Sequence, residues 1–486
     1  MQIRKTKIVC SLGPASSGDA LIRELILAGM NVARFNFSHG SHEEHKEKIE
    51  CVKRVSRELG IPVALLLDTK GPEIRTGLVE NDGKAAINKG DLVSVSIDDC
   101  CTVAAKDNNP ARISISWKEA PAKLQSGHHI RIADGLLDLE VLSVNGDVIN
   151  CRALNNAVIG SKKNVNLVGI HAGLPIISEK DKEDIAFGVK MEVDFIAASF
   201  LSFPHEVTVI KEYLKTLNSS IKVIAKIECR EGLVNIKEIA QEADGVMVAR
   251  GDLGVQLPTE QIPLAQKLII SECRKAGKPV ITATQMLESM IVNPSPTRAE
   301  LTDVANAIFD GTDAIMLSGE TTIGAYPVES VKMMDKIART VEESDEFRRH
   351  IKNIRFECLT EEHNPREILG KIMSHYGVEI SSEVKAKAII TPTLRGNTAR
   401  LLSSYRPEQC ILAVTPNDSV MRELQLYWGV YPCYAPIADK TESKIENSIK
   451  VALETGIAKV SEKIVLVAGL PLQSIYPVNT VRVLIL

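Results

Sequence analysis

The sequence predicts an α/β protein: a (β/α)8 barrel of the TIM type, with a small β-barrel lid domain inserted in it and a second α/β domain after it. Short apolar, β-branched runs alternate with helical patterns through most of the first 344 residues. One long interval among them has strand-and-turn character instead, and another α/β pattern follows it to the C-terminus. A chain of 486 residues has room for about three such domains.

Eight apolar runs are the expected barrel strands. Near-continuous apolar runs separated by helices are typical of a parallel sheet covered on both faces. Eight such units favour a closed barrel over the alternative, a doubly wound open sheet. The runs are KIVCSL (7–12), NVARFNF (31–37), PVALLLD (62–68), VDFIAASF (193–200), KVIAKIE (222–228), GVMVARG (245–251), PVITATQ (279–285) and AIMLSGE (314–320).

Capping patterns mark two of the intervening helices. Ser41 with Glu44, and Ser178 with Asp181, have the spacing of a capping box, and Gly60 is placed to end the first helix. The lid domain is expected where hairpin signals replace this rhythm, as at Asn145-Gly146 and Asp82-Gly83. The predicted domains are the barrel (1–72 and 163–344), the lid domain (73–162) and the C-terminal α/β domain (345–486).

The composition disfavours several classes of partner and of cellular location. A net charge of -4 and a pI of about 6.3 disfavour nucleic acid as a partner. No apolar run approaches the roughly 20 residues that span a membrane, and the first residues lack the apolar core of a signal peptide. The ten cysteines form no C-x-x-C pair. We expect reduced thiols and a cytoplasmic protein without a membrane partner.

Polar or charged residues end seven of the eight runs. In a (β/α)8 barrel all the carboxyl ends of the strands open onto one face, where active sites lie. A single polar strand end is usually a cap or a turn, but seven on one face predict a site. The residues are Arg34, Asn36, Ser38, Asp68, Thr69, Lys70, Ser199, Lys226, Glu228, Arg250, Asp252, Thr284, Gln285, Ser318 and Glu320.

These residue types favour phosphoryl transfer. Glu228 and Asp252 are hard oxygen ligands from neighbouring strands, which suit Mg²⁺ when a substrate supplies further oxygens. Each carboxylate alone could equally form a salt bridge or a helix cap. No histidine or cysteine is well placed as a nucleophile, and positioning and electrostatics dominate phosphoryl transfer. Four cations suit phosphate and carboxylate groups: Arg34, Arg75, Lys226 and Arg250.

Two other groups of residues do not predict a binding site. His42 and His45 lie one helical turn apart among glutamates, which is typical of a solvated helix face. The segment GSKKNVN lacks the spacing of a phosphate-binding P-loop, so Lys162-Lys163 is interpreted as a solvated linker.

The motifs resemble those of the pyruvate kinase family through the barrel and most of the third domain. The resemblance implies transfer of the phosphoryl group of phosphoenolpyruvate to ADP, giving pyruvate and ATP. It also implies Mg²⁺ or Mn²⁺, K⁺, a lid domain, a C-terminal regulatory domain and a homotetramer. The motifs include KIVCSLGPAS, GMNVARFNFSHG, LLLDTKGPEIRTG, GLPIISEKDKEDI, VARGDLGVQLP and TATQMLESMI.

The resemblance also implies roles for individual residues. Lys226 would stabilise the phosphoryl group in transfer, and Glu228 and Asp252 would hold Mg²⁺. The remaining roles are the phosphate (Arg34, Arg75), the substrate carboxylate (Gly251, Asp252, Thr284), the monovalent cation (Asn36, Ser38, Asp68, Thr69) and the nucleotide (Asn36, His39, Arg75). Protonation of the enolate by a water relay ending at Thr284 is a hypothesis.

Two positions near the site carry finer information. In the family, glutamate at the place of Glu73 accompanies K⁺ dependence and lysine accompanies its absence, because an ammonium can stand in for the cation. Glu73 therefore predicts activation by K⁺. Asn usually follows the metal-binding glutamate, but here it is Cys229. Strand alternation predicts that Cys229 faces away from Glu228 and changes packing only.

Two loops of the third domain also depart from the family. The phosphate loop T-x-S-G-x-[ST] is here TLRGNT, residues 393–398, with Thr393, Arg395, Asn397 and Thr398 as candidate effector ligands. A loop before a helix can still bind an anion. The glycine-rich effector loop is replaced by QSIYPVNT, residues 473–480. Activation by fructose 1,6-bisphosphate is therefore doubtful, and another phosphorylated effector, or none, is equally compatible.

Two alternatives belong to other functional classes. One is a catalytically silent relative that senses metabolites through its third domain, and retention of Lys226, Glu228, Asp252 and Thr284 speaks against it. The other is a barrel enzyme that uses phosphoenolpyruvate or pyruvate for carbon–carbon chemistry, which would lack the lid and the cation site. An assay with phosphoenolpyruvate, ADP and Mg²⁺ separates all three.

Overall fold

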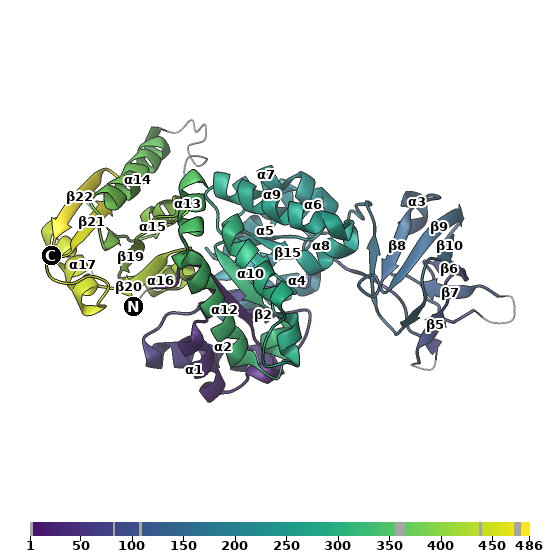
Figure 1. Ribbon diagram of the computed structural model, residues 1–486. Coiled ribbons are helices and arrows are strands. Elements are labelled where there is room, and N and C mark those ends of the chain that lie inside the picture. Colours follow the sequence, from purple (N-terminus) through teal and green to yellow (C-terminus); the bar gives the residue numbers. More distant parts are fainter. Residues whose placement is uncertain (1–2, 81–82, 106–108, 355–364, 437–439, 471–477) are drawn as a thin grey trace.

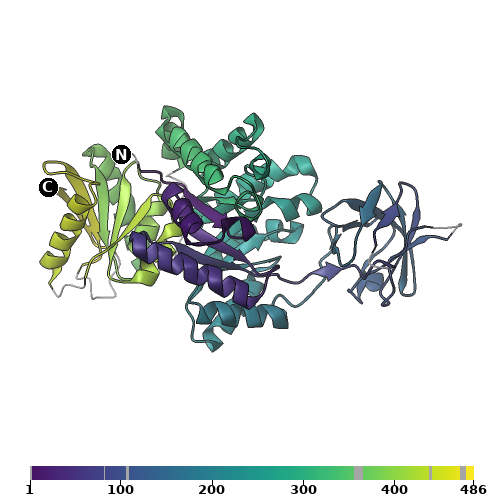
Figure 2. The same cartoon turned by 90° about the horizontal axis from the view of Figure 1, so that it is seen from below.

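The protein is an elongated molecule of three parts in a row, with the barrel in the centre, the inserted β domain at one end and the C-terminal α/β domain at the other (Figures 1 and 2). The structure is a computed structural model. It describes residues 3–80, 83–105, 109–354, 365–436, 440–470 and 478–486.

The barrel strands lie within the eight predicted runs. They form a closed parallel barrel in the order β1-β17-β16-β15-β14-β13-β3-β2, which confirms the barrel and excludes the open doubly wound sheet. The strands are β1 (Lys7–Ser11), β2 (Val32–Asn36), β3 (Ala64–Asp68), β13 (Phe195–Ala198), β14 (Lys222–Ile227), β15 (Gly245–Ala249), β16 (Val280–Ala283) and β17 (Ala314–Leu317).

A ring of helices covers the barrel and buries its apolar outer surface. Side chains such as Leu65 and Ile196 pack against the helices, while Val9 and Leu66 fill the barrel interior. The helices are α1 (Asp19–Ala28), α2 (His42–Leu59), α4 (Glu179–Lys190), α5 (Pro204–Thr216), α6 (Arg230–Val234), α7 (Ile236–Glu242), α8 (Arg250–Gln256), α9 (Ile262–Lys275), α10 (Arg298–Asp310), α11 (Gly319–Thr322), α12 (Pro327–Glu343) and α13 (Asp345–Ile354).

The predicted caps explain where two of these helices begin and end. The Ser178 hydroxyl accepts from the Asp181 N–H, and the Asp181 carboxylate accepts from the Ser178 N–H, so the capping box is reciprocal. At the start of α2, Ser41 accepts from the Glu44 N–H. Gly60 ends α2 with a φ of 64°, a left-handed conformation that favours glycine.

The inserted domain lies between β3 and α4. Seven of its strands form a sheet in the order β4-β12-β8-β9-β10-β6-β7, and β11 pairs with β5. A bridge between Thr76 and Ile115 joins the two edges, as expected for a small barrel. Its elements are β4 (Ile74–Arg75), β5 (Ala85–Ile87), β6 (Leu92–Ser96), β7 (Ala111–Ser114), α3 (Ala120–Lys123), β8 (His129–Ile132), β9 (Leu137–Asn145), β10 (Val148–Ala153), β11 (Ala157–Ile159) and β12 (Asn164–Leu167).

One of the two predicted hairpins can be compared with the structure. Asn145 and Gly146 turn between β9 and β10, with Gly146 at a φ of 59°. Asp82, of the other predicted turn, lies outside the described residues. The boundaries expected at 72/73, 162/163 and 344/345 stay predictions.

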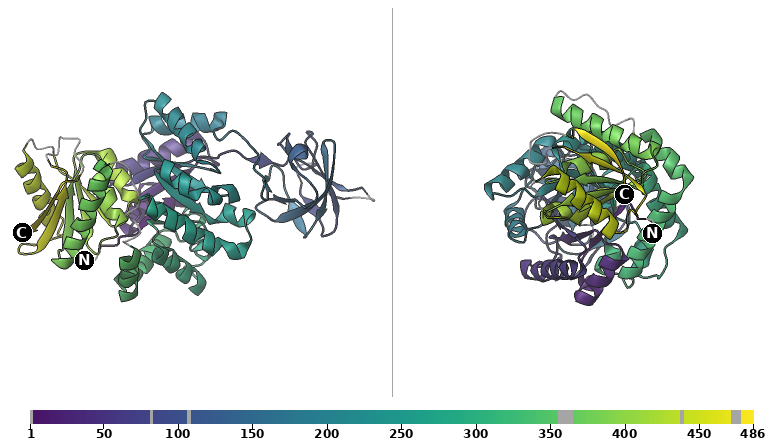
Figure 3. Two further views of the ribbon diagram at one scale, coloured as in Figure 1. Left: turned by 90° about the horizontal axis from the view of Figure 1, so that it is seen from above. Right: turned by 90° about the vertical axis from the view of Figure 1, so that its left-hand side faces the viewer.

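The C-terminal domain packs against the end of the barrel remote from the lid domain (Figure 3). Its sheet has the order β20-β19-β18-β21-β22, parallel except for β22. Its elements are α14 (Pro365–Glu383), β18 (Ala388–Pro392), α15 (Asn397–Ser404), β19 (Cys410–Thr415), α16 (Asp418–Glu423), β20 (Val430–Tyr434), α17 (Thr441–Glu454), β21 (Lys463–Ala468) and β22 (Thr480–Ile485). Within the described part of the chain, every helix is too short or too polar to cross a membrane.

Candidate active site

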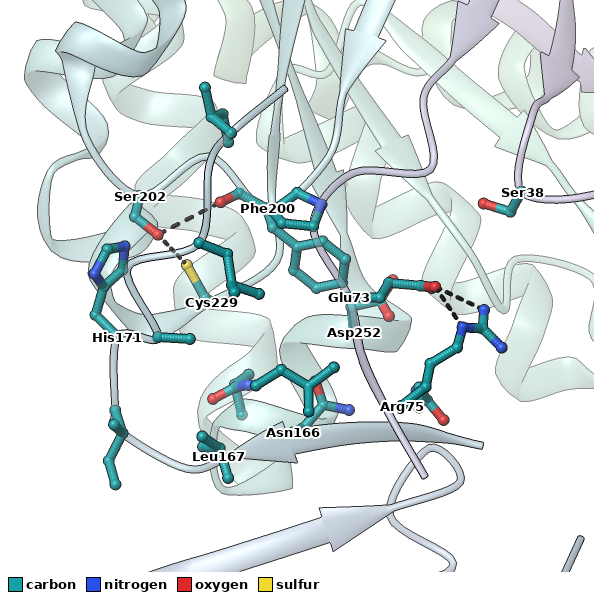
Figure 4. Close-up of a pocket in the computed structure, with 18 of the residues that line it drawn as sticks. Ser38, Glu73, Arg75, Asn166, Leu167, His171, Phe200, Ser202, Cys229 and Asp252 are labelled. Atoms are coloured by element: carbon teal, nitrogen blue, oxygen red, sulfur yellow. Dashed lines mark hydrogen bonds and ion pairs between the residues drawn. The ribbon is translucent and has the colours of Figure 1, made fainter. Parts of the chain in front are cut away.

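A cavity opens between the carboxyl ends of the barrel strands and the lid domain. It has a volume of about 420 Å³, and both domains contribute to its wall (Figure 4). Of the residues predicted from sequence, those that line it are Asn36, Ser38, His39, Glu73, Arg75 and Asp252. The other predicted residues lie at the same strand ends but do not form its wall: Arg34, Asp68, Thr69, Lys226, Glu228, Gly251 and Thr284.

The Lys226 ammonium group is the centre of a buried cluster. Its nitrogen lies 2.7 Å from Ser199 Oγ, 2.8 Å from Glu228 Oε1 and 3.0 Å from Asp68 Oδ1. β13, β14 and β3 are neighbours in the barrel, which is why their carboxyl ends bring these groups together. The predicted convergence of polar strand ends is thus present in the structure.

The outer atoms of this cluster are also held. Asp68 Oδ2 accepts from Arg34 Nε at 2.7 Å, and Arg34 Nη1 donates to Ser11 Oγ at 2.7 Å. Glu228 Oε2 accepts from the Phe200 N–H at 2.6 Å. Phe200 has a φ of 58°, a left-handed conformation that is uncommon for a bulky residue and that aims its N–H at the carboxylate.

Burial and charge shift the pKa values of the cluster in different directions. Burial opposes ionisation of Asp68 and Lys226, but the charges around them prevail. Arg34 and Lys226 lower the pKa of Asp68, and Asp68 and Glu228 raise the pKa of Lys226. Burial raises the pKa of Glu228 to about 7, against the attraction of Lys226 and with the repulsion of Asp252. Burial likewise raises the pKa of Asp252, despite the opposing charge of Lys226. The site is therefore short of positive charge next to two carboxylates.

That shortage fits a divalent cation. Glu228 is buried and Asp252 is half-buried at the cavity wall, and burial disfavours the ionisation of both carboxylates. Mg²⁺ is usually bound by one or two carboxylates together with substrate oxygens and water, and not by protein ligands alone. Among the described residues, at this site or elsewhere, no cluster of three or more His, Cys, Asp or Glu side chains is suited to a metal ion.

Four oxygen-bearing residues expected at a monovalent cation site are also neighbours. Asn36 and Asp68 are register partners on β2 and β3, and the Asp68 carbonyl accepts from Phe37 N–H at 2.9 Å. Asn36 Oδ1 accepts from the Ser38 N–H at 3.1 Å, and the Thr69 carbonyl accepts from Ser199 Oγ at 2.7 Å. Carbonyl, amide and carboxylate oxygens at adjacent strand ends are compatible with K⁺.

Thr284 follows β16 in a strained conformation. Its φ is 69°, which is an outlier for a β-branched residue and is typical of functional sites. Its hydroxyl donates to the Ala283 carbonyl at 2.6 Å and accepts from the Gly251 N–H at 2.9 Å. The Gly251 N–H, predicted to bind a substrate carboxylate, thus has a protein partner in this structure.

The charge of Arg250 suggested that it binds a substrate group, but its guanidinium binds other residues of the protein. It is buried, donates to Asp303 at 2.8 Å and donates to the Thr284 carbonyl at 2.5 Å. The guanidinium therefore stabilises the strained backbone at Thr284.

Glu73 and Arg75 pair on the lid side of the cavity (Figure 4). Glu73 Oε2 lies 2.6 and 2.8 Å from two guanidinium nitrogens of Arg75 and 3.4 Å from Lys70 Nζ. Arg75 also donates to the Lys162 carbonyl at 2.8 Å. Arg75 is therefore held at the cavity wall between the two strands that lead into the lid.

Several residues of the cavity were missed in the sequence. Lys162 and Lys163 line it, although they were interpreted as a solvated linker. Asp134 of the lid lies close enough to raise the pKa of Asp252 after the larger effect of burial. The only sequence signal was the basic pair itself, because the return from the lid to the barrel is fixed by tertiary pairing of β12 with β4.

Cys229 lies outside the strand from which its orientation was predicted. Strand β14 ends at Ile227, so strand alternation does not extend to residue 229. Cys229 caps α6 by accepting the Gly232 N–H at 3.4 Å, touches Ser202 Oγ at 3.3 Å and lines the cavity (Figure 4). An N-cap is a place where asparagine is favoured.

The predicted effector loop lies at the start of α15, as expected. Thr393 Oγ1 accepts from the Gly396 N–H at 2.9 Å, and Gly396 has a φ of 80° before the helix. Arg395 is exposed, and Asn397 and Thr398 begin the helix. Of the segment 473–480, which replaces the family's glycine-rich effector loop, residues 473–477 lie outside the described residues.

The chain is similar to known proteins in both sequence and fold. The family model described as the pyruvate kinase barrel domain matches residues 3–331, and the model of the pyruvate kinase alpha/beta domain matches residues 372–484. Pyruvate kinases of Staphylococcus aureus strains MRSA252 and USA300 are each 44% identical over 471 residues, covering 96% of this chain and 78% of the relative. A crystal structure of a pyruvate kinase from Cryptosporidium parvum is 39% identical, with a TM-score of 0.91 over 99% of this chain and 96% of that one.

The barrel, its lid and the buried cluster of cations and carboxylates define a phosphotransferase. The chain belongs to the pyruvate kinase family.

Proposed function

We propose that the Lys226 cluster is where this chain transfers the phosphoryl group of phosphoenolpyruvate to ADP, giving pyruvate and ATP. The observation that carries this proposal is that Lys226 Nζ lies within 3.0 Å of both Glu228 and Asp68, at the carboxyl ends of two barrel strands, β14 and β3. Membership of the family, and 44% identity to pyruvate kinases over nearly the whole chain, support the reaction.

The roles of the cations follow from their positions. Arg75 on the cavity wall and Arg34 beside Asp68 would hold the phosphate of the substrate. Lys226 would stabilise the group as it leaves the enol oxygen and bonds to the terminal phosphate oxygen of ADP. Fixed charges of this kind, aimed at developing negative charge, are worth about 10²–10³-fold in rate each.

Glu228 and Asp252 would hold Mg²⁺ or Mn²⁺. Such an ion, when bound, neutralises substrate oxygens and so favours transfer. Asn36, Ser38, Asp68 and Thr69 would bind K⁺ at the ends of β2 and β3. Asn36, His39 and Arg75 line the cavity and would contact the nucleotide. Lys162 and Lys163 line the same cavity, which supports the same role for them.

Transfer breaks the bond between phosphorus and the enol oxygen and leaves the enolate of pyruvate, which must be protonated at carbon. The N–H groups of Gly251 and Asp252, with Thr284, would seat the substrate carboxylate once Thr284 changes its partner. We propose a water relay that ends at Thr284. If a Thr284→Val variant protonated the enolate as fast as the parent enzyme, measured by exchange of tritium into pyruvate, the relay would be disproved.

We also propose a regulatory site and a quaternary structure. Thr393, Arg395, Asn397 and Thr398 would bind a phosphorylated effector at the start of α15, and the chain would assemble as a homotetramer. Titration of activity with a panel of sugar phosphates and nucleotides, and sedimentation of the full chain, test these two expectations.

One assay tests the reaction and the assignment of Lys226. Pyruvate formation from phosphoenolpyruvate and ADP with Mg²⁺ is coupled to lactate dehydrogenase. We expect Lys226→Met to lower kcat by about 10²–10³-fold. The matched control is Lys222→Met, at the opposite end of the same strand, which should keep its activity. An active Lys226→Met variant would remove the proposed site.

A further inference from the structure

The Lys226 ammonium has no hydrogen left for a substrate in this structure. An ammonium group has three N–H donors, and the three acceptors at 2.7, 2.8 and 3.0 Å account for all of them. A phosphoryl group can therefore bind Lys226 directly only if one of Ser199, Glu228 and Asp68 gives up its hydrogen bond. Which partner leaves determines how the lysine is aimed.

Asp68 is the partner with the most reasons to stay. Its other carboxylate oxygen is bound by Arg34 at 2.7 Å, and the aspartate is fully buried. Its main-chain carbonyl is fixed by Phe37 N–H on the neighbouring strand. Turning the carboxylate from Lys226 would disturb both cations at once.

Ser199 is held as firmly, and its hydrogen bonds have a defined direction. Its hydroxyl donates to the Thr69 carbonyl at 2.7 Å, which leaves only its lone pairs to accept from Lys226. Its own N–H contacts Thr69 Oγ1 at 3.3 Å. A Cβ placed on Gly71 would lie 2.7 Å from Ser199 Cβ, so the serine fills a space that exists only because residue 71 is glycine.

Glu228 is the partner that can release its hydrogen bond to Lys226. Its Oε2 keeps the Phe200 N–H at 2.6 Å, so a small rotation can move Oε1 alone from Lys226. Glu228 is also the proposed divalent-cation ligand, and a cation would compensate Oε1 for the ammonium it loses. The exchange frees one N–H of Lys226 and leaves Ser199 and Asp68 in place.

We infer that Ser199 is the positioning residue of Lys226: a fixed neutral acceptor, tied to Thr69, that keeps the ammonium aimed when Glu228 changes its partner. The inference rests on the proposed function of Lys226 and adds a residue that its assignment does not include. Ser199 touches no reacting atom in this scheme and acts through the lysine.

The test compares Ser199→Ala with the parent enzyme. Removal of the hydroxyl leaves Lys226 with two carboxylates and no neutral acceptor, so we expect kcat to fall about 10- to 100-fold while KM for phosphoenolpyruvate changes less than twofold. Ser199→Thr keeps the hydroxyl and should retain kcat within about fivefold. The matched control is Ser330→Ala, a buried serine of α12 whose hydroxyl also donates to a carbonyl at 2.7 Å.

A second measurement shows whether the variant site is intact. Mn²⁺ binding, followed by electron paramagnetic resonance, should be within twofold of the parent in Ser199→Ala, because Glu228 and Asp252 remain. In the parent, phosphoenolpyruvate and Mn²⁺ should strengthen each other's binding, because the cation releases Lys226. In Ser199→Ala this mutual effect should fall at least threefold, because one N–H of Lys226 is already free.

The failures are distinguishable. If Ser199→Ala keeps kcat within twofold while Lys226→Met is inactive, Ser199 does not position the lysine and only this inference fails. A raised KM with an unchanged kcat would make Ser199 a substrate ligand instead, and would also overturn it. An unchanged mutual effect of Mn²⁺ and phosphoenolpyruvate would exclude the exchange by Glu228. An active Lys226→Met variant would remove the proposed function itself.

Discussion

At the scale of single residues, the site is built from groups whose partners differ from those their chemistry suggested. Arg250 was counted among the cations for a substrate, but it binds Asp303 and the Thr284 carbonyl. Lys226 and Glu228 were expected to face one phosphoryl group, and in the structure they pair with each other at 2.8 Å. Buried charges take the nearest opposite charge, because an unpaired one is expensive.

Cys229 gives a prediction about stability. A thiol is a weak acceptor for the N–H at the start of α6, and asparagine caps a helix more strongly. Cys229→Asn should raise the free energy of unfolding by about 0.5–1 kcal/mol. Thermal unfolding of the variant checks this, with Cys51→Asn in the interior of α2 as a control that should be destabilised. A lower midpoint for Cys229→Asn would contradict the capping role.

Glu73 gives a prediction about the monovalent cation. Lysine at this position would bring an ammonium toward the expected K⁺ site and would also release Arg75 from its acceptor. Glu73→Lys should therefore lower the ratio of activity with K⁺ to activity with tetramethylammonium at least fivefold, with some loss of kcat. Glu80→Lys, at an exposed lid position, should leave the ratio unchanged. Full activity of the parent without K⁺ or Na⁺ would contradict the dependence itself.

At the scale of elements, the period of the sequence explains why the barrel strands were predictable, while the lid residues that reach the cavity were not. Each barrel strand lies within an apolar run, because a strand covered on both faces must be apolar along its length. The alternation failed at residue 229, where the strand had already ended. Lys162 and Lys163 reach the cavity only through the pairing of β12 with β4, which joins residues about 90 apart and leaves no local signal.

Helix α8 carries Asp252 and is also where the lid rests on the barrel. Arg131 of β8 donates to the Val255 carbonyl in α8 at 2.5 Å. Arg131→Met should loosen the lid and raise KM for ADP at least threefold, with KM for phosphoenolpyruvate within twofold. Arg152→Met, at an exposed position of β10, is the control that should change neither. Equal KM values for ADP in Arg131→Met and the parent would show that this contact does not hold the lid.

At the scale of the whole molecule, buried ion pairs join the C-terminal domain to the barrel. Arg406 binds Asp313 through two nitrogens at 2.6 and 2.9 Å, and Arg422 of α16 binds Asp194 at 2.9 Å. Such pairs could not be foreseen, because their members are far apart in the sequence and each looks like a surface charge. The Asp194 carboxylate also accepts from the Leu65 N–H of β3, so α16 is linked to the strand that ends at Asp68.

Asp194 predicts how the stability of the molecule depends on pH. Burial raises its pKa to about 7, against the attraction of Arg422, whereas an aspartate in the unfolded chain titrates near 3.8. The folded protein therefore binds the proton more tightly, and the stability that this contributes is complete below pH 3.8 and is lost as the pH rises to about 7. An asparagine cannot titrate, so Asp194→Asn should lack this loss.

The thermal midpoint of the parent protein should accordingly fall relative to that of Asp194→Asn between pH 5 and pH 7, by the equivalent of about 2 kcal/mol, and the gap should then stay constant. Differential scanning calorimetry across this range measures it. Asp418→Asn, an exposed aspartate at the start of α16, is the matched control and should track the parent at every pH. A constant gap between the parent and Asp194→Asn from pH 5 to pH 7 would mean that Arg422 keeps the buried carboxylate ionised throughout. The contact between the domains would then be a permanent ion pair, insensitive to pH in this range.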